Sequence, residues 1–188
     1  MDTFNHIKTL ITIILGLSIT HLLKGVAKFI QHPHRDKPYW LHLAWVFYIF
    51  MLLVHFWWWE YRLTHVQHWS FTSYFFIIFF IMTFYSLCAL LFPDDIKDYK
   101  GYEDYFFSRK KWFFAILAFS YLLDIGDTLI KGQDYFNSLS IEYPIRNAVH
   151  IILCLLAIQI NNRIFNGTLV ILFILYELSY ILRLFDTV

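Results

Sequence analysis

The sequence predicts an all-α integral membrane protein that folds as a six-helix bundle. The composition is 59% hydrophobic and 22% aromatic, with only 15% charged residues, whereas a soluble domain carries about a quarter charged residues. Six apolar stretches are each long enough to cross a hydrocarbon core of ~30 Å, which takes roughly 20 helical residues. These stretches occupy most of the 188 residues. We therefore expect a single transmembrane domain, 1–188, without a separate soluble unit.

The six predicted spans are separated by short polar links. They cover about residues 4–24, 39–62, 70–92, 112–131, 144–161 and 167–185. Pro38 and Pro144 stand at the openings of the second and fifth spans, where the missing N–H of proline leaves no hydrogen bond unmade. Trp40 and Trp112 begin spans at positions typical of the aromatic belts at membrane interfaces. The acidic link 93–104 is expected to be a solvated, partly helical connection.

Lys and Arg side chains are distributed unevenly between the two sides of the predicted bundle. Such residues accumulate in cytoplasmic loops. With the N-terminus outside, ten of the 15 Lys and Arg residues lie on the inner side, namely Lys24, Lys28, Arg35, Lys37, Lys97, Lys100, Arg109, Lys110, Lys111 and Arg163. The sequence therefore predicts a cell-membrane protein with both termini outside, and a bacterial inner membrane is the expected location.

Several function classes lack a supporting motif. The formal net charge is +1 and no basic block stands out, which argues against nucleic-acid binding. The two cysteines, Cys88 and Cys154, lie inside predicted spans without CxxC spacing, so neither a disulfide framework nor a zinc site is predicted. No HExxH or GxSxG motif is present. An enzyme is therefore the less favoured class, and no metal or cofactor is expected.

Two segments suggest an internal duplication. Lys24-Gly25 and Lys131-Gly132 each follow an apolar run, at an offset of 107 residues, while Pro38 and Pro144 are offset by 106. Three helices per half would make the halves inverted with respect to each other. The sequence thus predicts two inverted three-helix repeats, and a chance match between Leu-rich and Ile-rich helices is the alternative.

A set of short segments resembles a group of small bacterial multi-pass membrane proteins that have no assigned function. The segments are residues 16–25 (GLSITHLLKG), 38–42 (PYWLH), 55–58 (HFWW), 91–94 (LFPD) and 124–128 (DIGDT). The similarity spans nearly the whole chain. It implies the same membrane class and implies no chemistry.

Acidic and histidine side chains recur inside the predicted spans. Asp124 and Asp127 are three residues apart and share one helix face. A charged side chain near the middle of a membrane span costs about 2.5–3.5 kcal/mol on insertion scales. Such groups therefore usually face the bundle interior and have a partner or a function. A helix that ends before them would instead leave both at the interface. His21, Lys24 and His42 form a second, inner group that interfacial placement explains.

The candidate site gathers the deep polar residues from four spans. Its members are Asp124, Asp127, Glu177, His150, Arg146, His55 and Glu60. We expect an outer-half cavity in which the three acids of the fourth and sixth spans pair with Arg146 or a protonated His150. The predicted function is to bind and move a small cation, a proton or a polar solute. Two alternatives stay open: a set of purely structural ion pairs, and a non-transporting sensor or scaffold that acts through a protein partner or a homo-oligomer.

Overall fold

Helices make up the protein, and no strand occurs among the residues that the structure describes. A computed structural model describes residues 3–33, 37–66 and 68–185. The elements are α1 (Thr3–Gln31), α2 (Trp40–Trp59), the 3-10 helix η1 (Glu60–His65), α3 (Phe71–Leu91), α4 (Tyr102–Ile130), α5 (Gln133–Ser138), α6 (Glu142–Gln159) and α7 (Arg163–Phe185). The predicted all-α class is confirmed.

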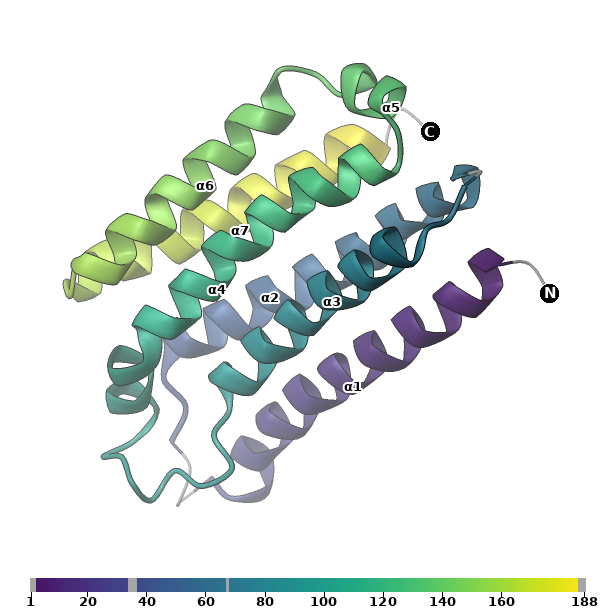
Figure 1. Cartoon of the computed structure of the whole chain (residues 1–188). Helices are drawn as coiled ribbons and strands as arrows, with labels where there is room; N and C mark the ends of the chain where they lie inside the picture. The colour runs from purple at the N-terminus through teal and green to yellow at the C-terminus, as the bar shows by residue number, and fades with distance from the viewer. Residues whose placement is uncertain (1–2, 34–36, 67, 186–188) are drawn as a thin grey trace.

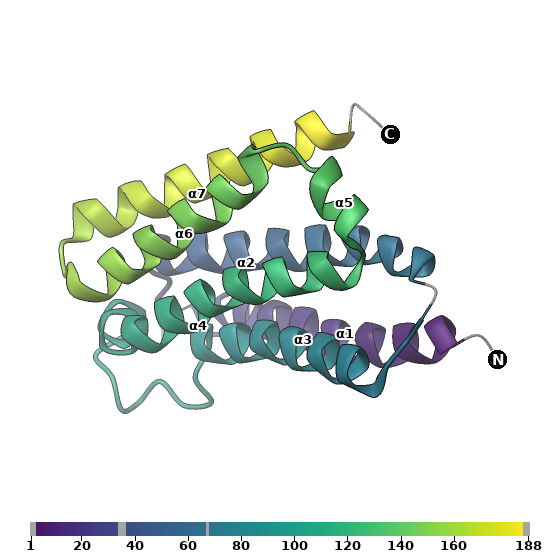
Figure 2. The same ribbon diagram turned by 45° about the horizontal axis from the view of Figure 1, so that its top comes forward.

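The long helices run up and down in two layers. In one layer α1 packs on α3, α3 on α4 and α4 on α6, and in the other layer α2 packs on α7. The described chain begins and ends at the same end of the bundle (Figure 1), together with η1 and α5. We call this the terminal end. The opposite end, with the links 92–101 and 160–162, is the loop end. Figure 2 shows the two layers from another side.

Five of the helices that the structure describes are long and apolar enough to cross a membrane. The candidate spans are Asn5–Gln31, Trp40–His65, Phe71–Leu91, Tyr102–Ile130 and Arg163–Arg183. Large apolar side chains remain exposed on the outward faces, including Leu17, Phe75, Leu122, Leu155 and Leu172. Extended apolar surface of this kind marks contact with a membrane or a partner. The chain thus has the architecture of a multi-pass membrane protein.

The predicted fifth span and several predicted boundaries differ from the structure. The span at 144–161 falls on α6, which is not among the five candidates and carries Arg146, Asn147 and His150. α1 continues to Gln31 instead of ending near residue 24, and α4 begins at Tyr102 instead of near residue 112. The buried rings of Tyr102, Tyr105 and Phe106 anchor these early turns of α4. The short helix α5 lies where a link was predicted. Arg35, which was assigned to the inner side, lies outside the described residues.

The predicted inverted repeat is wrong. Gly25 does not end a helix: it lies inside α1, where an added Cβ would stand 2.2 Å from the Phe92 ring. Gly132 does end α4, with a φ of +124° that glycine adopts readily. In the first half α1 packs mainly on α3, whereas in the second half α4 packs on α6 instead of α7. The matching Lys-Gly pairs therefore serve different purposes in differently packed halves.

Two histidines complete the end of α3 at the loop end. The last carbonyls of a helix lack an intrahelical donor. His42 Nε2 lies 2.6 Å from the Leu91 carbonyl oxygen and His21 Nε2 lies 3.3 Å from that of Phe92. Because a carbonyl only accepts, both rings donate. The inner histidine group is thus a cap for α3 and not merely an interfacial cluster.

Lys110 completes the end of α6 in the same way. Its side chain is buried, and Nζ donates to the carbonyl oxygens of Ala157 at 2.6 Å and Ile160 at 2.7 Å. A cation at a helix C-terminus is also favoured by the helix dipole. One of the ten lysines and arginines assigned to the inner side is therefore a structural cap.

An aromatic layer fills the middle of the bundle. We use this name for Trp45, Tyr48, Phe113, Phe114 and Phe173, which are all buried. The Trp45 ring centroid lies 5.2–5.6 Å from those of the other four, in edge-to-face arrangements that add about 0.5–1.5 kcal/mol per pair beyond burial. The layer separates the polar residues of the terminal end from the loop end.

Candidate functional site

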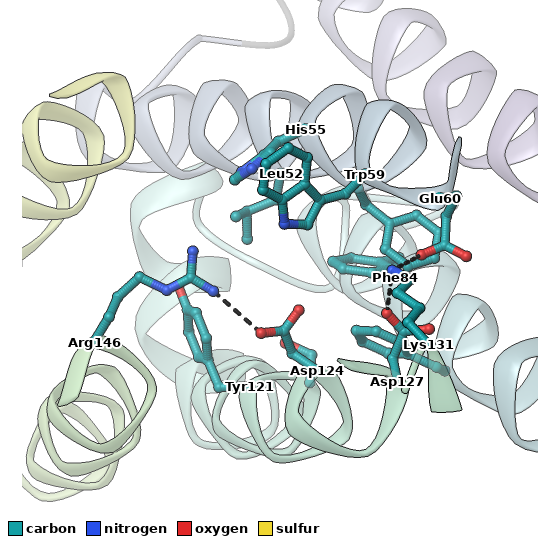
Figure 3. Close-up of a pocket in the computed structure, with 13 residues that line it drawn as sticks. Leu52, His55, Trp59, Glu60, Phe84, Tyr121, Asp124, Asp127, Lys131 and Arg146 are labelled. Atoms are coloured by element: carbon teal, nitrogen blue, oxygen red, sulfur yellow. Dashed lines mark hydrogen bonds and ion pairs between the residues drawn. The ribbon is translucent and has the colours of Figure 1, made fainter. Parts of the chain in front are cut away.

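A small polar cavity lies between α2, η1, α3, α4 and α6 toward the terminal end (Figure 3). Apolar side chains such as Leu52, Phe56, Phe80 and Phe84 form part of its wall. Its volume is about 40 Å³. A buried water needs at least about 10–15 Å³ on this measure. The cavity therefore has room for two or three waters, or for one small ion with part of its hydration.

Lys131 joins two carboxylates at one side of the cavity. It follows the last residue of α4, one turn after Asp127. Its Nζ donates to Asp127 Oδ2 at 2.6 Å and to Glu60 Oε1 at 2.8 Å. The side chains of all three residues are no more than 4% exposed. A single buried ammonium thus serves two buried carboxylates from α4 and η1.

Each of these carboxylates keeps one oxygen without a partner. Glu60 Oε2 and Asp127 Oδ1 are buried and receive no hydrogen bond from any described residue. Leaving a buried charged group incompletely paired is costly, and such an exception calls for an explanation. Because both residues line the cavity, a proton or a cation held there would satisfy the two oxygens.

Asp124 anchors a second group across the cavity. Its Oδ2 accepts from Arg146 at 3.1 Å, from Asn147 Nδ2 at 2.9 Å and from the Tyr143 hydroxyl at 2.9 Å. The Arg146 guanidinium also lies over the Tyr180 ring, 4.6 Å from its centroid. Stacking and hydrogen bonding hold Arg146 in one place. This group ties α6 to α4 and α7.

His55 and Glu177 form a third pair beside the cavity. His55 Nδ1 is hydrogen-bonded to Glu177 Oε1, and both side chains are buried. The His55 ring also contacts the rings of Trp59 and Tyr180. The pair joins α2 to α7, which are adjacent helices of the second layer. Glu177 therefore pairs with His55, not with Arg146 or His150 as the sequence predicts.

The charges of the three groups do not balance. The carboxyl groups of Glu60, Asp127, Asp124 and Glu177 face two permanent cations, those of Lys131 and Arg146. With all four carboxyls ionised, two negative charges are uncompensated, and one remains if His55 is protonated. Because charge is expensive inside a low-dielectric bundle, the cavity favours the uptake of protons or cations.

The structure brings most of the predicted site residues together. Five of them line the cavity, namely His55, Glu60, Asp124, Asp127 and Arg146, and Glu177 adjoins it through His55. Both aspartates lie within α4, which continues to Ile130. The helix therefore does not end before them.

His150, like Glu177, is a predicted site residue that does not line the cavity. Its Nδ1 donates to the Arg146 carbonyl oxygen at 2.8 Å, within α6. Its ring packs against those of Tyr121 and Phe173, with centroids 4.8 and 4.4 Å away. The Tyr121 ring, which does line the cavity, lies next to it. His150 thus supports the wall of the cavity.

Sequence reasoning missed three polar contributors: Lys131, Asn147 and Tyr143. Lys131 lies four residues after Asp127, a spacing at which opposite charges pair on a helix. That spacing could have indicated a pair between Asp127 and Lys131. Lys131 also lies at the predicted end of its span, where an unpaired lysine is expected as well. Asn147 and Tyr143 lie close to Arg146 on α6 and carry no charge, so nothing in the sequence pattern links them to Asp124.

The aromatic layer closes the cavity toward the loop end. Tyr121 lines the cavity and its hydroxyl is hydrogen-bonded to that of Tyr48, a member of the layer. Trp45 and Phe114 lie beyond this pair and are fully buried. Within the described structure the cavity is thus closed on the side that faces the loop end. No family model, curated protein or solved structure matches the chain.

Proposed function

We propose that the protein binds a proton or a small monovalent cation in the polar cavity and moves it across the membrane. The observation that supports this most directly is the pair of unpartnered oxygens on Glu60 and Asp127, which share one lysine. The excess of carboxyl groups over permanent cations supports the same conclusion. A bound positive charge would satisfy both oxygens and offset one of the two excess negative charges.

The cavity size and its ligands narrow the choice of substrate. Pockets for organic molecules have volumes of about 300–1,000 Å³, whereas this cavity has about 40 Å³. Among the described residues, no group of three or more His, Cys, Asp or Glu side chains is arranged to hold a metal ion. A proton or a monovalent cation therefore fits better than a larger polar solute or a transition metal.

A non-transporting sensor or scaffold is the second candidate. It is favoured by the aromatic layer, because the edge-to-face rings of Trp45, Phe113 and Phe114 fill the described bundle between the cavity and the loop end. In that case a bound proton or cation would change the packing of α4 and α6, and a partner protein would detect the change. Flux distinguishes the two candidates, because only a transporter moves the ion.

We expect Glu60→Gln and Asp127→Asn each to lower ion flux at least about tenfold. Either change removes one of the carboxylates that share Lys131 while keeping the side-chain shape. Tenfold corresponds to about 1.4 kcal/mol, less than the full loss of a charged hydrogen bond, about 1.5–3 kcal/mol. The measurement is proton, Na⁺ and K⁺ flux into proteoliposomes under an imposed gradient.

The control is Glu103→Gln. Glu103 pairs with Arg163 at 2.8 Å near the loop end and is partly exposed, so this variant should keep wild-type flux. Unchanged flux in both cavity variants would show that the cavity is not on the transport path. A wild-type protein that binds the ion but passes none would support the sensor instead.

We also propose that α6 crosses the membrane, which makes six spans with both termini outside. α6 has 18 residues, or about 27 Å at 1.5 Å per residue, close to the ~30 Å hydrocarbon core. Its polar side chains, Arg146, Asn147 and His150, are buried and do not face lipid. The excess of basic residues toward the loop end supports a cytoplasmic loop end.

Reporter fusions should confirm this topology. Alkaline phosphatase fused after Phe185 should be active, because that enzyme folds outside the cytoplasm, and a fusion within the link 93–101 should be inactive. The reverse pattern would invert the topology. Activity at both sites would mean that the number of spans between them is even.

A further inference from the structure

We propose that an anionic phospholipid binds in a groove between α1 and the end of α2, with its phosphate group held by Lys8 and Arg62. The groove has a volume of about 640 Å³ and lies at the terminal end. That volume is within the range of about 300–1,000 Å³ that is typical of ligand pockets. The site is separate from the polar cavity, although Trp59 and Glu60 line both.

The groove wall is mainly aromatic and aliphatic. Ile11 of α1 faces the consecutive tryptophans Trp57, Trp58 and Trp59 of α2 across it. Trp57 and Trp58 are 39% and 54% exposed, so the groove opens on the outer surface of the bundle. Tryptophans concentrate at the level of the lipid head groups. The groove is therefore placed where a lipid can enter sideways with its glycerol and upper acyl chain among the rings.

Basic side chains supply the charge for a phosphate. Lys8 Nζ lies 6.0 Å from the Trp57 ring centroid, and the Arg62 guanidinium lies 5.3 Å from that of Tyr135. Both side chains line the groove. Within the described residues neither is in an ion pair with a carboxylate, as the paired lysines and arginines elsewhere are. Both charges are thus available to an anion.

The acid in the groove wall does not cancel this charge. Glu60 lines the groove, but its Oε1 accepts from Lys131 at 2.8 Å. The groove also includes His65, which adds a further donor near Arg62. Basic pockets between transmembrane helices on the cytoplasmic side bind anionic lipid head groups, and the same attraction of basic side chains for a phosphate applies to a pocket at the outer surface. A phospholipid fits better than a soluble phosphate ester, because the apolar wall would remain uncovered by the latter.

The test is native mass spectrometry of the detergent-solubilised full chain with phosphatidylglycerol or phosphatidylcholine of equal chain length. We expect the wild type to retain phosphatidylglycerol in preference to phosphatidylcholine. The double variant Lys8→Gln/Arg62→Gln should bind it about 25-fold more weakly, because each basic residue near the surface contributes roughly fivefold. The matched control is Lys100→Gln/Lys111→Gln, which removes two exposed charges toward the loop end and should bind as the wild type does.

Three outcomes would overturn the proposal: equal retention of the two lipids, equal loss in the control variant, or displacement of the lipid by millimolar glycerol phosphate. The last result would assign the basic pair to a soluble phosphate compound. A melting temperature within the wild-type range shows that the Lys8→Gln/Arg62→Gln variant is folded. If that variant does not fold, the single change Lys8→Gln, on the exposed face of α1, provides the same test with an expected effect of roughly fivefold.

Discussion

Replacing Lys131 by methionine should destabilise the protein by about 3–5 kcal/mol, the cost of removing one partner of a buried ion pair. Methionine keeps most of the apolar stem but lacks the ammonium that donates to Glu60 and Asp127. Two buried carboxylates would then repel each other without a cation between them. The measurement is the midpoint of thermal unfolding in detergent, monitored through the loss of monodisperse protein.

The double variant Lys131→Met/Glu60→Gln should recover part of this loss. With the carboxylate of Glu60 replaced by an amide, one negative charge in the group is removed and the new amide can donate to Asp127. The interaction energy from the double-mutant cycle should be in the range of about 0.5–3 kcal/mol that contacting residues show. Lys111→Met, at an exposed position toward the loop end, serves as the control. If Lys131→Met melted at the same temperature as this control, Lys131 would not be the cation that neutralises the site.

The sequence was sufficient for the helices because their signal is local. Apolar runs of about 20 residues predict spans wherever they occur, and each of the six predicted spans overlaps a long helix. The boundaries were harder to predict. In residues 102–111, charged residues such as Arg109 and Lys111 alternate with buried Tyr102 and Phe106, and hydropathy averages the two faces. Such a segment reads as a polar link although one face packs against the core.

The pairing within the site could not be predicted, because it depends on how helices far apart in sequence pack. The depth of Asp124 and Asp127 was enough to mark them as candidates. The ion-pair partners within the site could not be found in this way, because they are far apart in sequence. Glu60 is 71 residues from Lys131, and His55 is 122 residues from Glu177. The arrangement of α2, α4 and α7 around one cavity decides which acid meets which base. Periodicity along one helix carries no such information.

The link between α6 and α4 should depend most on Arg146. Replacing Arg146 by methionine is expected to cost about 3 kcal/mol, the lower end of the range for a broken buried ion pair. The value lies at the lower end because Asp124 is partly exposed and keeps the donors Asn147 and Tyr143. The stability of Arg146→Lys should fall between those of the wild type and Arg146→Met. An ammonium restores the charge but not the planar stacking on Tyr180.

Arg183→Met is the matched control for this variant. Arg183 pairs with Glu142 at 2.5 Å, but that pair is exposed at the terminal end, where ion pairs contribute about 0–1 kcal/mol. Equal losses of thermal stability in Arg146→Met and Arg183→Met would mean that burial of the Asp124 pair has no energetic effect. Adding Asp124→Asn to Arg146→Met should restore stability, because the amide removes the uncompensated charge and can still accept from Asn147 and Tyr143. A double variant no more stable than Arg146→Met would place the role of Arg146 in its stacking on Tyr180 and not in neutralising Asp124.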